Sequence, residues 1–383
     1  MVMGVVLAAL AVLPLLAAAQ SCYGGNTIAG SNNVMPNGKY QIASEGIRAN
    51  FIPYGASLSN LFITDVHGVE RDIVLGFDNA TYYTESKMHP HLCGVPGRYA
   101  NRIKNGTFTI DGETFHTNLN DNGGLDTLHG GADGWDYRNW TVVAHTTDSI
   151  TFNIVDPDGK EGFPGQVIAY VTYTVQPYQW HLKMTALSTT KKTPILLDGF
   201  QNPSTPLALN YSLYLPYAGT RIAIDNIEIP TGDILANKQY SVNDFWSAPK
   251  QLGANITSPS LLGNCGYNCT GYDTCYIQNR DAYGPYNWRQ APVATLASPF
   301  SGTFAIKETQ GFFNDSSRPR VAEKYGCVVM EVEDWIDGIN NPEWGRDKKQ
   351  IFGPGDDPYV LEATYNFSLN HTLAATFDHT ATS

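Results

Sequence analysis

Short runs of alternating apolar and polar residues, separated by turn residues, recur along nearly the whole chain. The clearest is Val167-Ile168-Ala169-Tyr170-Val171-Thr172-Tyr173-Thr174-Val175. Period-2 alternation with β-branched and aromatic residues is typical of half-buried β-strands. The same pattern covers residues 42–63, 107–115, 149–155 and 180–186, and no stretch combines a long 3.6-residue periodicity with helix caps. We therefore predict an all-β fold, a large antiparallel β-sandwich.

The charge balance limits the partners of the chain. Its 383 residues carry a formal net charge of -12, and the pI is near 5.1. This acidic excess argues against nucleic acid and against anionic membrane surfaces, and it leaves neutral small molecules as ligands. Hydrophobic residues make up 42% of the chain, enough for a sizeable core, and all-β folds of this size often form one domain.

The N-terminus has the features of a secretory signal peptide. Val5 to Leu16 is apolar, and Ala17-Ala18-Ala19 provides a small-residue cleavage site before Gln20. The alternative is a membrane anchor, which the short apolar run disfavours. We expect a signal peptide at residues 1–19, a single domain at residues 20–383 and an extracellular protein.

Sequons and cysteines agree with secretion. Asn-x-Ser/Thr sequons begin at Asn79, Asn105, Asn139, Asn210, Asn255, Asn268, Asn314, Asn366 and Asn370, and we expect several to be glycosylated. In an oxidising compartment some of the six cysteines should form disulfides, although the sequence does not choose the pairing: Cys22, Cys93, Cys265, Cys269, Cys275 and Cys327. We expect no metal at the 265–275 cluster, because a zinc site needs four closely spaced ligands. Cys327 lies in an apolar run and is compatible with a buried free thiol.

Two polar clusters flank a predicted hairpin. The hairpin runs over residues 107–115, with Asp111-Gly112 as its turn. Before it stands Gly97-Arg98-Tyr99-Ala100-Asn101-Arg102-Ile103, and after it stands Leu128-His129-Gly130-Gly131. An amide, one or two guanidinium groups and an imidazole in a Gly-rich loop can hold the hydroxyl groups of a neutral sugar.

This block resembles the aldose 1-epimerase (galactose mutarotase) family, and the resemblance continues in order from about residue 38 to residue 369. It includes Gly55-Ala56-Ser57-Leu58, Asp72 to Phe77, Gly134-Trp135-Asp136, Asp158 to Gly165, Ile229 to Asp233, Gly271-Tyr272-Asp273 and Glu331 to Asp337. It implies the galactose mutarotase-like supersandwich and an isomerase that interconverts the α and β anomers of a neutral hexose such as glucose or galactose. Ring opening by acid and base needs no cofactor and no metal.

The resemblance also implies roles for individual residues. Glu331 matches the catalytic base, and Glu333, two residues on, is its rival because strand alternation puts both on one face. His129, Asn101, Arg102 and Asp273 match groups that bind the sugar, and Gln310 is a further candidate. Trp135, Tyr137, Trp140, Trp335 and Trp344 could stack on sugar faces, although most aromatic residues of a large sandwich are core or rim.

One departure concerns the general acid. The family carries it on a histidine in an Asn-His-Ser/Thr-Tyr motif of a central strand, and the matching segment here is Leu207 to Tyr214, with Tyr211 at the histidine position. No histidine occurs between His181 and His371. Tyr211 could donate the proton as a weaker acid, the substrate could differ, or catalysis could be lost.

Two other functions stay open at this point. The first is a catalytically weak or inactive secreted carbohydrate-binding protein on the same fold. The second is a glycoside-cleaving enzyme, which needs a second carboxyl group roughly 5–10 Å from Glu331. Glu333, Asp337 and Asp273 are the candidates.

Overall fold

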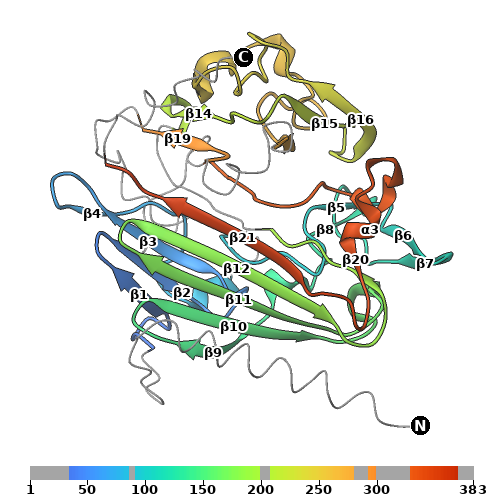
Figure 1. The fold of residues 1–383 in the computed structure, drawn as a ribbon, viewed down its shortest axis with the longest axis horizontal. Coiled ribbons are helices and arrows are strands. Elements are labelled where there is room, and N and C mark those ends of the chain that lie inside the picture. The colour runs from blue at the N-terminus through green and yellow to red at the C-terminus, as the bar shows by residue number, and fades with distance from the viewer. Residues whose placement is uncertain (1–33, 86–90, 199–207, 280–291, 299–327, 370–383) are drawn as a thin grey trace, which may run out of the picture.

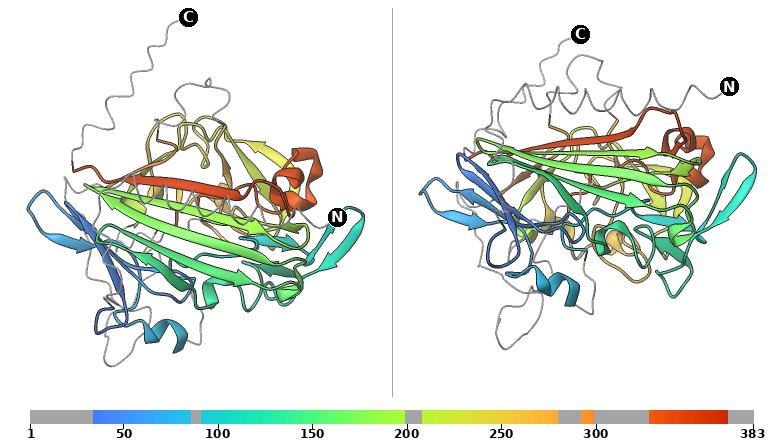
Figure 2. Two further views of the ribbon diagram at one scale, coloured as in Figure 1. Left: turned by 60° about the horizontal axis from the view of Figure 1, so that its bottom comes forward. Right: turned by 90° about the horizontal axis from the view of Figure 1, so that it is seen from below.

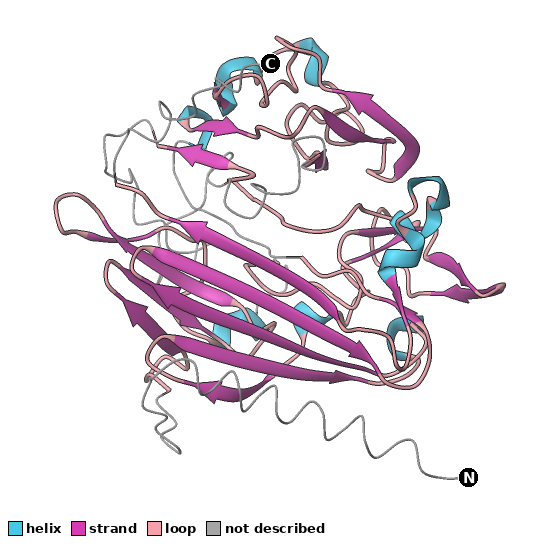
Figure 3. Cartoon of the chain, viewed as in Figure 1, coloured by secondary structure: helices cyan, strands magenta, loops and turns pink. Residues whose placement is uncertain are grey.

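The structure, a computed structural model, describes residues 34–85, 91–198, 208–279, 292–298 and 328–369. Within these ranges the chain is built almost entirely of strands and connecting loops, as Figure 3 shows. No helix in the described ranges is both long enough and apolar enough to cross a bilayer.

Two antiparallel sheets form the larger part of the molecule (Figure 1). The first has the order β1-β2-β3-β4, with β1 at Tyr40–Ser44, β2 at Ile47–Phe51, β3 at Leu58–Thr64 and β4 at Glu70–Asp72. The second has the order β21-β12-β11-β10-β9, with β9 at Thr141–His145, β10 at Ser149–Asp156, β11 at Val167–Gln176, β12 at Gln179–Ser188 and β21 at Tyr359–Asn366. The strand predictions over these segments are confirmed, and residues 42–63 contain three strands.

The main core lies between these two sheets. Alternate residues of β11, from Val167 to Val175, are buried, and the residues between them are more exposed. They join residues of β2 and β3 in one apolar cluster, in which the rings of Phe51 and Tyr173 stack with centroids 4.6 Å apart. Such a ring pair contributes about 0.5–1.5 kcal/mol beyond the area that it buries. The predicted all-β sandwich is therefore confirmed.

Smaller sheets and single turns complete the chain and carry the loops of the site. The hairpin pairs β6 at Thr107–Ile110 with β7 at Glu113–His116, and both turn residues, Asp111 and Gly112, have positive φ as its tight turn requires. Two further sheets have two strands each: β5 at Arg102–Lys104 pairs with β8 at Asp126–Leu128, and β13 at Thr193–Pro194 pairs with β20 at Ile351–Phe352. Two more have three strands each. In one, β14 at Ser212–Tyr214 lies between β17 at Lys250–Gln251 and β19 at Thr295–Ala297, and in the other, β15 at Thr220–Ile224 lies between β16 at Pro230–Ala236 and β18 at Tyr276–Ile277.

Helices are short. Two single α-helical turns, α2 at Thr81–Glu85 and α3 at Asp347–Gln350, accompany 3-10 turns at Trp135–Tyr137, Lys160–Gly162, Ala208–Asn210, Leu252–Asn255, Pro259–Leu261, Gly338–Asn340 and Pro342–Trp344. The two views of Figure 2 show the small sheets of residues 208–279 gathered beside the larger pair.

Two local predictions were wrong. Residues 207–214 do not form one strand, because the described part starts with a 3-10 turn at Ala208–Asn210 and only Ser212–Tyr214 pairs as β14. The alternation rule therefore does not place Tyr211. Residues 328–333 are likewise outside any strand, and Val329 is 41% exposed, so strand alternation does not apply to Glu331 and Glu333.

One disulfide joins two of the described cysteines, Cys265 and Cys269. Cys93 and Cys275 are thiols, and Cys93 is buried. Cys22 and Cys327 lie outside the described residues, so the expectation for Cys327 stays a prediction.

Candidate functional site

The two arginines of the block at 97–103 have different environments. Arg98 is 1% exposed, pairs with Asp156 at 2.7 Å, and donates to the backbone carbonyls of Pro164 and Gly165. It therefore holds loops together inside the protein. The side chain of Arg102, four residues on, is 15% exposed and forms ion pairs with Asp121 at 3.0 Å and with Glu228 at 2.5 Å. Of the two, Arg102 is the one that faces the site.

The loops that carry Asn101 and His129 are locked to each other. The backbone N–H of His129 donates to the carbonyl of Asn101 at 3.1 Å, and the backbone N–H of Asn101 donates to Nδ1 of His129 at 3.0 Å. Both residues have positive φ, 58° and 51°, a conformation often found at functional sites. An alanine Cβ at Gly130 would lie 2.0 Å from the carbonyl oxygen of Gly97, so only glycine allows this approach.

His129 is held in its neutral form. Burial lowers its pKa well below the ordinary value, and the charges of His91 and Arg102 lower it further. Because Nδ1 accepts the Asn101 N–H, the ring proton resides on Nε2. His129 can therefore donate one hydrogen bond from Nε2.

Glu331 combines exposure with a raised pKa. The residue is exposed, yet the protein around it displaces enough water to raise its pKa to about 7, and the charge of Asp273 adds to this effect. Contact with Asp198 and the charges of His91 and Arg102 act in the opposite direction. These four groups, drawn from separate parts of the chain, therefore surround one accessible carboxyl group.

Glu333 lies deeper than Glu331. Its Oε1 accepts a hydrogen bond from Nδ2 of Asn101 at 3.2 Å, and its Oε2 is buried with no hydrogen-bond partner among the described residues. Burial, followed by the charge of Glu331, raises its pKa well above the ordinary value. Glu333 is half-buried and supports Asn101, whereas Glu331 is exposed, so Glu331 is the carboxyl group of the pair that a ligand can reach.

Sequence reasoning missed Asp198. It is 0% exposed, and its carboxyl group lies against the backbone N–H of Val332 and the side chain of Glu331. Its neighbour is the carboxyl group of Glu331, and burial, together with the charges of Glu331 and Glu333, raises the pKa of Asp198 well above the ordinary value. Two carboxyl groups in contact favour sharing one proton. Residues 193–198 are thus the segment that brings a carboxyl group into contact with Glu331. In the sequence, this segment is marked only by an aspartate at the end of a short apolar run.

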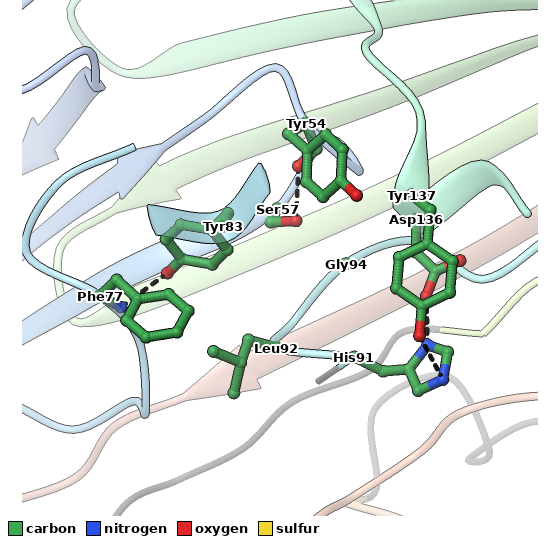
Figure 4. Close-up of a pocket in the computed structure, with 9 residues that line it drawn as sticks. All are labelled: Tyr54, Ser57, Phe77, Tyr83, His91, Leu92, Gly94, Asp136 and Tyr137. Atoms are coloured by element: carbon green, nitrogen blue, oxygen red, sulfur yellow. Dashed lines mark hydrogen bonds and ion pairs between the residues drawn. The ribbon is translucent and has the colours of Figure 1, made fainter. Parts of the chain in front are cut away.

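His91 was also missed. Its Nδ1 pairs with Asp136, its Nε2 lies 2.9 Å from the hydroxyl of Tyr137, and its ring contacts that of His129 with centroids 4.7 Å apart. Figure 4 shows the ring of His91 joined to both Asp136 and Tyr137 at the edge of a small pocket that Tyr54, Phe77 and Leu92 also line. A histidine six residues before Gly97 matched no motif, so sequence offered no reason to select it.

The other candidates are placed differently. Tyr211 is 6% exposed and packs with Leu215, Phe245 and Leu252 in an apolar cluster. Gln310 lies outside the described residues. Trp135 and Trp140 are buried in the main core, whereas Trp335 and Trp344 are half-buried and contact each other edge to face. No three His, Cys, Asp or Glu side chains of the described chain are arranged to hold a metal ion.

Comparison with known proteins gives one consistent answer. The sequence model of the Aldose 1-epimerase family matches residues 38–357. A probable aldose 1-epimerase of Arthroderma benhamiae is 36% identical over 86% of both chains, and an epimerase of Gibberella zeae is 34% identical over 88% of this chain and 86% of its own. Human galactose mutarotase is 26% identical over 86% of this chain and 94% of its own.

A solved structure shares the fold. The GalM/aldose epimerase homologue of C. elegans superposes with a TM-score of 0.70 at 23% identity, over 86% of this chain and 98% of its own. The galactose 1-epimerase of Lactobacillus acidophilus gives a TM-score of 0.64 at 18% identity, over 85% and 92% of the two chains. The family model that matches residues 38–357 and the 36% identity to the Arthroderma benhamiae protein establish that the chain belongs to the aldose 1-epimerase family.

Proposed function

We propose that this protein is an aldose 1-epimerase that interconverts the α and β anomers of a neutral hexose of the glucose or galactose type. Membership of the family supports an isomerase of this kind. The site supports it independently, because an accessible carboxyl group stands among an amide, a guanidinium group and a neutral imidazole.

The observation that carries the proposal is that Glu331 has a raised pKa and is also exposed. A general base works best when its pKa lies near the pH at which it operates. The surrounding protein, which displaces water from the carboxyl group, and the charge of Asp273 raise the pKa of Glu331 to about 7, while the residue itself remains exposed. Glu331 is thus both basic enough to take a proton from a hydroxyl group and open to the ligand that carries it.

The reaction follows from that state. Glu331 takes the proton of the C1 hydroxyl, the C1–O1 bond becomes a carbonyl, and the electron pair of the C1–O5 bond moves to the ring oxygen, which receives a proton from an acid. The open aldehyde turns about C1–C2, and the same groups return both protons when the ring closes on the other face of C1. Each positioned proton-transfer group is worth about 10²–10⁴ in rate.

The remaining groups hold the sugar. Arg102 is fixed by its two carboxylate partners, so its remaining N–H groups are held in place to donate to hydroxyl oxygens. Nε2–H of His129 donates, and the exposed carboxylate of Asp273 accepts from hydroxyl groups. Asn101 is turned toward Glu333 at 3.2 Å and joins this set through its amide. Gln310 remains a candidate from sequence alone.

Polarimetry of fresh α-D-glucose and α-D-galactose tests the proposal. The wild type should shorten the relaxation, and Glu331→Gln should lose about 10²–10⁴ of that acceleration. Glu362→Gln is the matched control, because Glu362 forms an exposed ion pair with Lys183 on the large sheet and should react like the wild type. A wild type that binds the sugar without accelerating relaxation would favour the carbohydrate-binding alternative.

We also propose that the protein is secreted and glycosylated. The support is the signal-like segment at residues 1–19, together with sequons whose asparagines are exposed, namely Asn105, Asn139, Asn268 and Asn366. Mass spectrometry of the protein recovered from the medium of a secreting host should find Gln20 at the N-terminus and glycans on these asparagines. An intact Met1 without glycans would contradict this proposal.

A further inference from the structure

Ring opening needs an acid as well as a base, and the segment matched to the family's acid carries no histidine. Tyr211, which stands there, is buried in an apolar cluster with Phe245 and Leu252. The donor is therefore better sought among the groups that do act on Glu331.

His91 is the histidine among those groups. Its charge acts on Glu331, and its ring contacts that of His129, one of the proposed sugar ligands. A quarter of its side chain, 25%, is exposed, against 2% for its partner Asp136. His91 thus lies at the wall of the site and can be reached, while the carboxylate behind it is shielded from water.

Asp136 gives His91 a buried carboxylate partner. Asp136 pairs with Nδ1, and the other oxygen of this carboxylate is buried with no hydrogen-bond partner within the described ranges. A buried carboxylate needs a cation or donors to offset its desolvation, and His91 is the group positioned to supply the charge. An imidazolium then donates from Nδ1 to Asp136 and from Nε2 to the hydroxyl oxygen of Tyr137, 2.9 Å away.

The two histidines, whose rings meet edge to face, therefore have different tasks. His129 is neutral, because burial and its neighbours lower its pKa, and Nδ1 accepts a backbone N–H. His91 instead has a carboxylate against Nδ1, and its Nε2 lies 2.9 Å from the hydroxyl of Tyr137.

We propose that His91 is the general acid of this site, with Asp136 as the residue that positions and charges it; the inference rests on the proposed function. When the sugar binds, its ring oxygen replaces the Tyr137 hydroxyl as the acceptor of Nε2–H. As the C1–O5 bond breaks, its electron pair takes this proton, while Glu331 receives the proton of the C1 hydroxyl. Ring closure reverses both transfers, so neither residue changes its net charge over a turnover.

The pH profile of kcat/KM tests this assignment. Activity needs Glu331 ionised and His91 protonated at once, so the wild type should give a bell-shaped profile. His91→Gln should lower the rate about 10²–10⁴-fold and leave only the limb that rises as Glu331 ionises, with sugar affinity changed less than about threefold. His181→Gln is the matched control, because His181 forms a hydrogen bond with Thr364 on the large sheet. This variant should keep the bell-shaped pH profile of the wild type.

Several titratable or charged groups face His91 and can affect the pH profile. They are Asp136, Tyr137, His129, Glu331 and Arg102, together with Tyr54 and Tyr83 of the adjoining pocket. Asp136→Asn keeps the shape but removes the negative charge, so the falling limb should move to lower pH. This second variant serves if His91→Gln does not fold. Nuclear magnetic resonance of labelled histidine should show the loss of the His91 imidazolium in Asp136→Asn.

Each result decides the matter. An active wild type whose His91→Gln variant keeps its rate and its bell overturns the inference alone. The same holds if Tyr211→Phe loses the falling limb while His91→Gln keeps it. A wild type that accelerates neither sugar overturns the proposed function and this inference with it, and that result is read from the wild-type trace before any variant is compared.

Discussion

The backbone N–H of Asn101 donates to Nδ1 of His129 at 3.0 Å, and this bond decides which way the imidazole can act. With Nδ1 engaged as an acceptor, the neutral ring carries its proton on Nε2. The same bond ties the loop after β8 (Asp126–Leu128) to the loop before β5 (Arg102–Lys104), two strands that pair through Arg102 and Leu128. One hydrogen bond thus sets both the nitrogen from which His129 donates and the relative position of the two loops.

Replacing His129 should weaken sugar binding more than it slows the chemical step. His129→Phe removes the Nε2 donor, and an unsatisfied buried hydroxyl costs about 1–3 kcal/mol, so KM should rise about 5–150-fold while kcat changes little. Steady-state kinetics from pH 6 to pH 8 measure both constants. A fall in kcat at unchanged KM would instead assign His129 to proton transfer.

Asp198 should set the pH at which Glu331 becomes active. The contact with Asp198 lowers the pKa of Glu331, which burial and Asp273 hold at about 7. Asp198→Asn keeps a donor toward Glu331, so the rising limb of the rate profile should stay near pH 7. Asp198→Ala removes that donor, so the limb should move to higher pH. Identical profiles for the two variants would contradict a shared proton between Asp198 and Glu331.

Asp337 should make the protein less stable as the pH rises. It is 0% exposed, and burial raises its pKa to about 7, whereas an unfolded aspartate titrates near 3.9. Because the folded pKa is the higher one, its stabilising contribution is complete below about pH 4 and is lost as the pH rises toward 7.

Asp337→Asn mimics the protonated form and keeps an acceptor for Nδ2 of Asn340. At pH 8 the variant should be more stable than the wild type, with a free energy of unfolding about 1–3 kcal/mol higher. At pH 4 the two free energies should match. Urea denaturation at both values measures this. A variant that is less stable at pH 8 would show that the ionised carboxylate stabilises the fold.

Gly130 should resist substitution far more than another glycine with the same backbone conformation. Gly130 and Gly124 have φ of 84° and 86°, but a Cβ at Gly124 would meet nothing within 4 Å, whereas at Gly130 it would lie 2.0 Å from Gly97 O. Gly124→Ala should cost about 1 kcal/mol of left-handed strain and keep activity. Gly130→Ala should displace the His129 loop and lose activity, and comparable thermal midpoints and rates for the two would contradict the close packing.

Local pattern was enough to predict the framework. The alternation in 167–175 and the Asp111-Gly112 turn placed β11 (Val167–Gln176) and the hairpin of β6 and β7 correctly, because strand faces and tight turns depend on neighbouring residues. The chain that carries Glu331 and Glu333 was mistaken for a strand, since a short run does not reveal whether a partner strand lies beside it.

The site could be predicted only where a motif carried it. Asn101, Arg102 and His129 belong to the quoted block, and the structure brings them together. Sequence could not tell that Arg98 is buried against Asp156 while Arg102 faces the site, because that difference arises from long-range packing. His91 and Asp198 reach Glu331 from segments far away in the chain, so no spacing pointed to them.

The most direct test of the account is anomeric exchange measured by two-dimensional exchange spectroscopy on glucose and galactose at pH 7.5, with wild type and Glu331→Gln at equal occupancy. The account predicts exchange well above the spontaneous rate for the wild type, and a loss of about 10²–10⁴-fold in the variant at similar sugar affinity. A variant that binds and exchanges the sugar as fast as the wild type would contradict the assignment of Glu331 as the base.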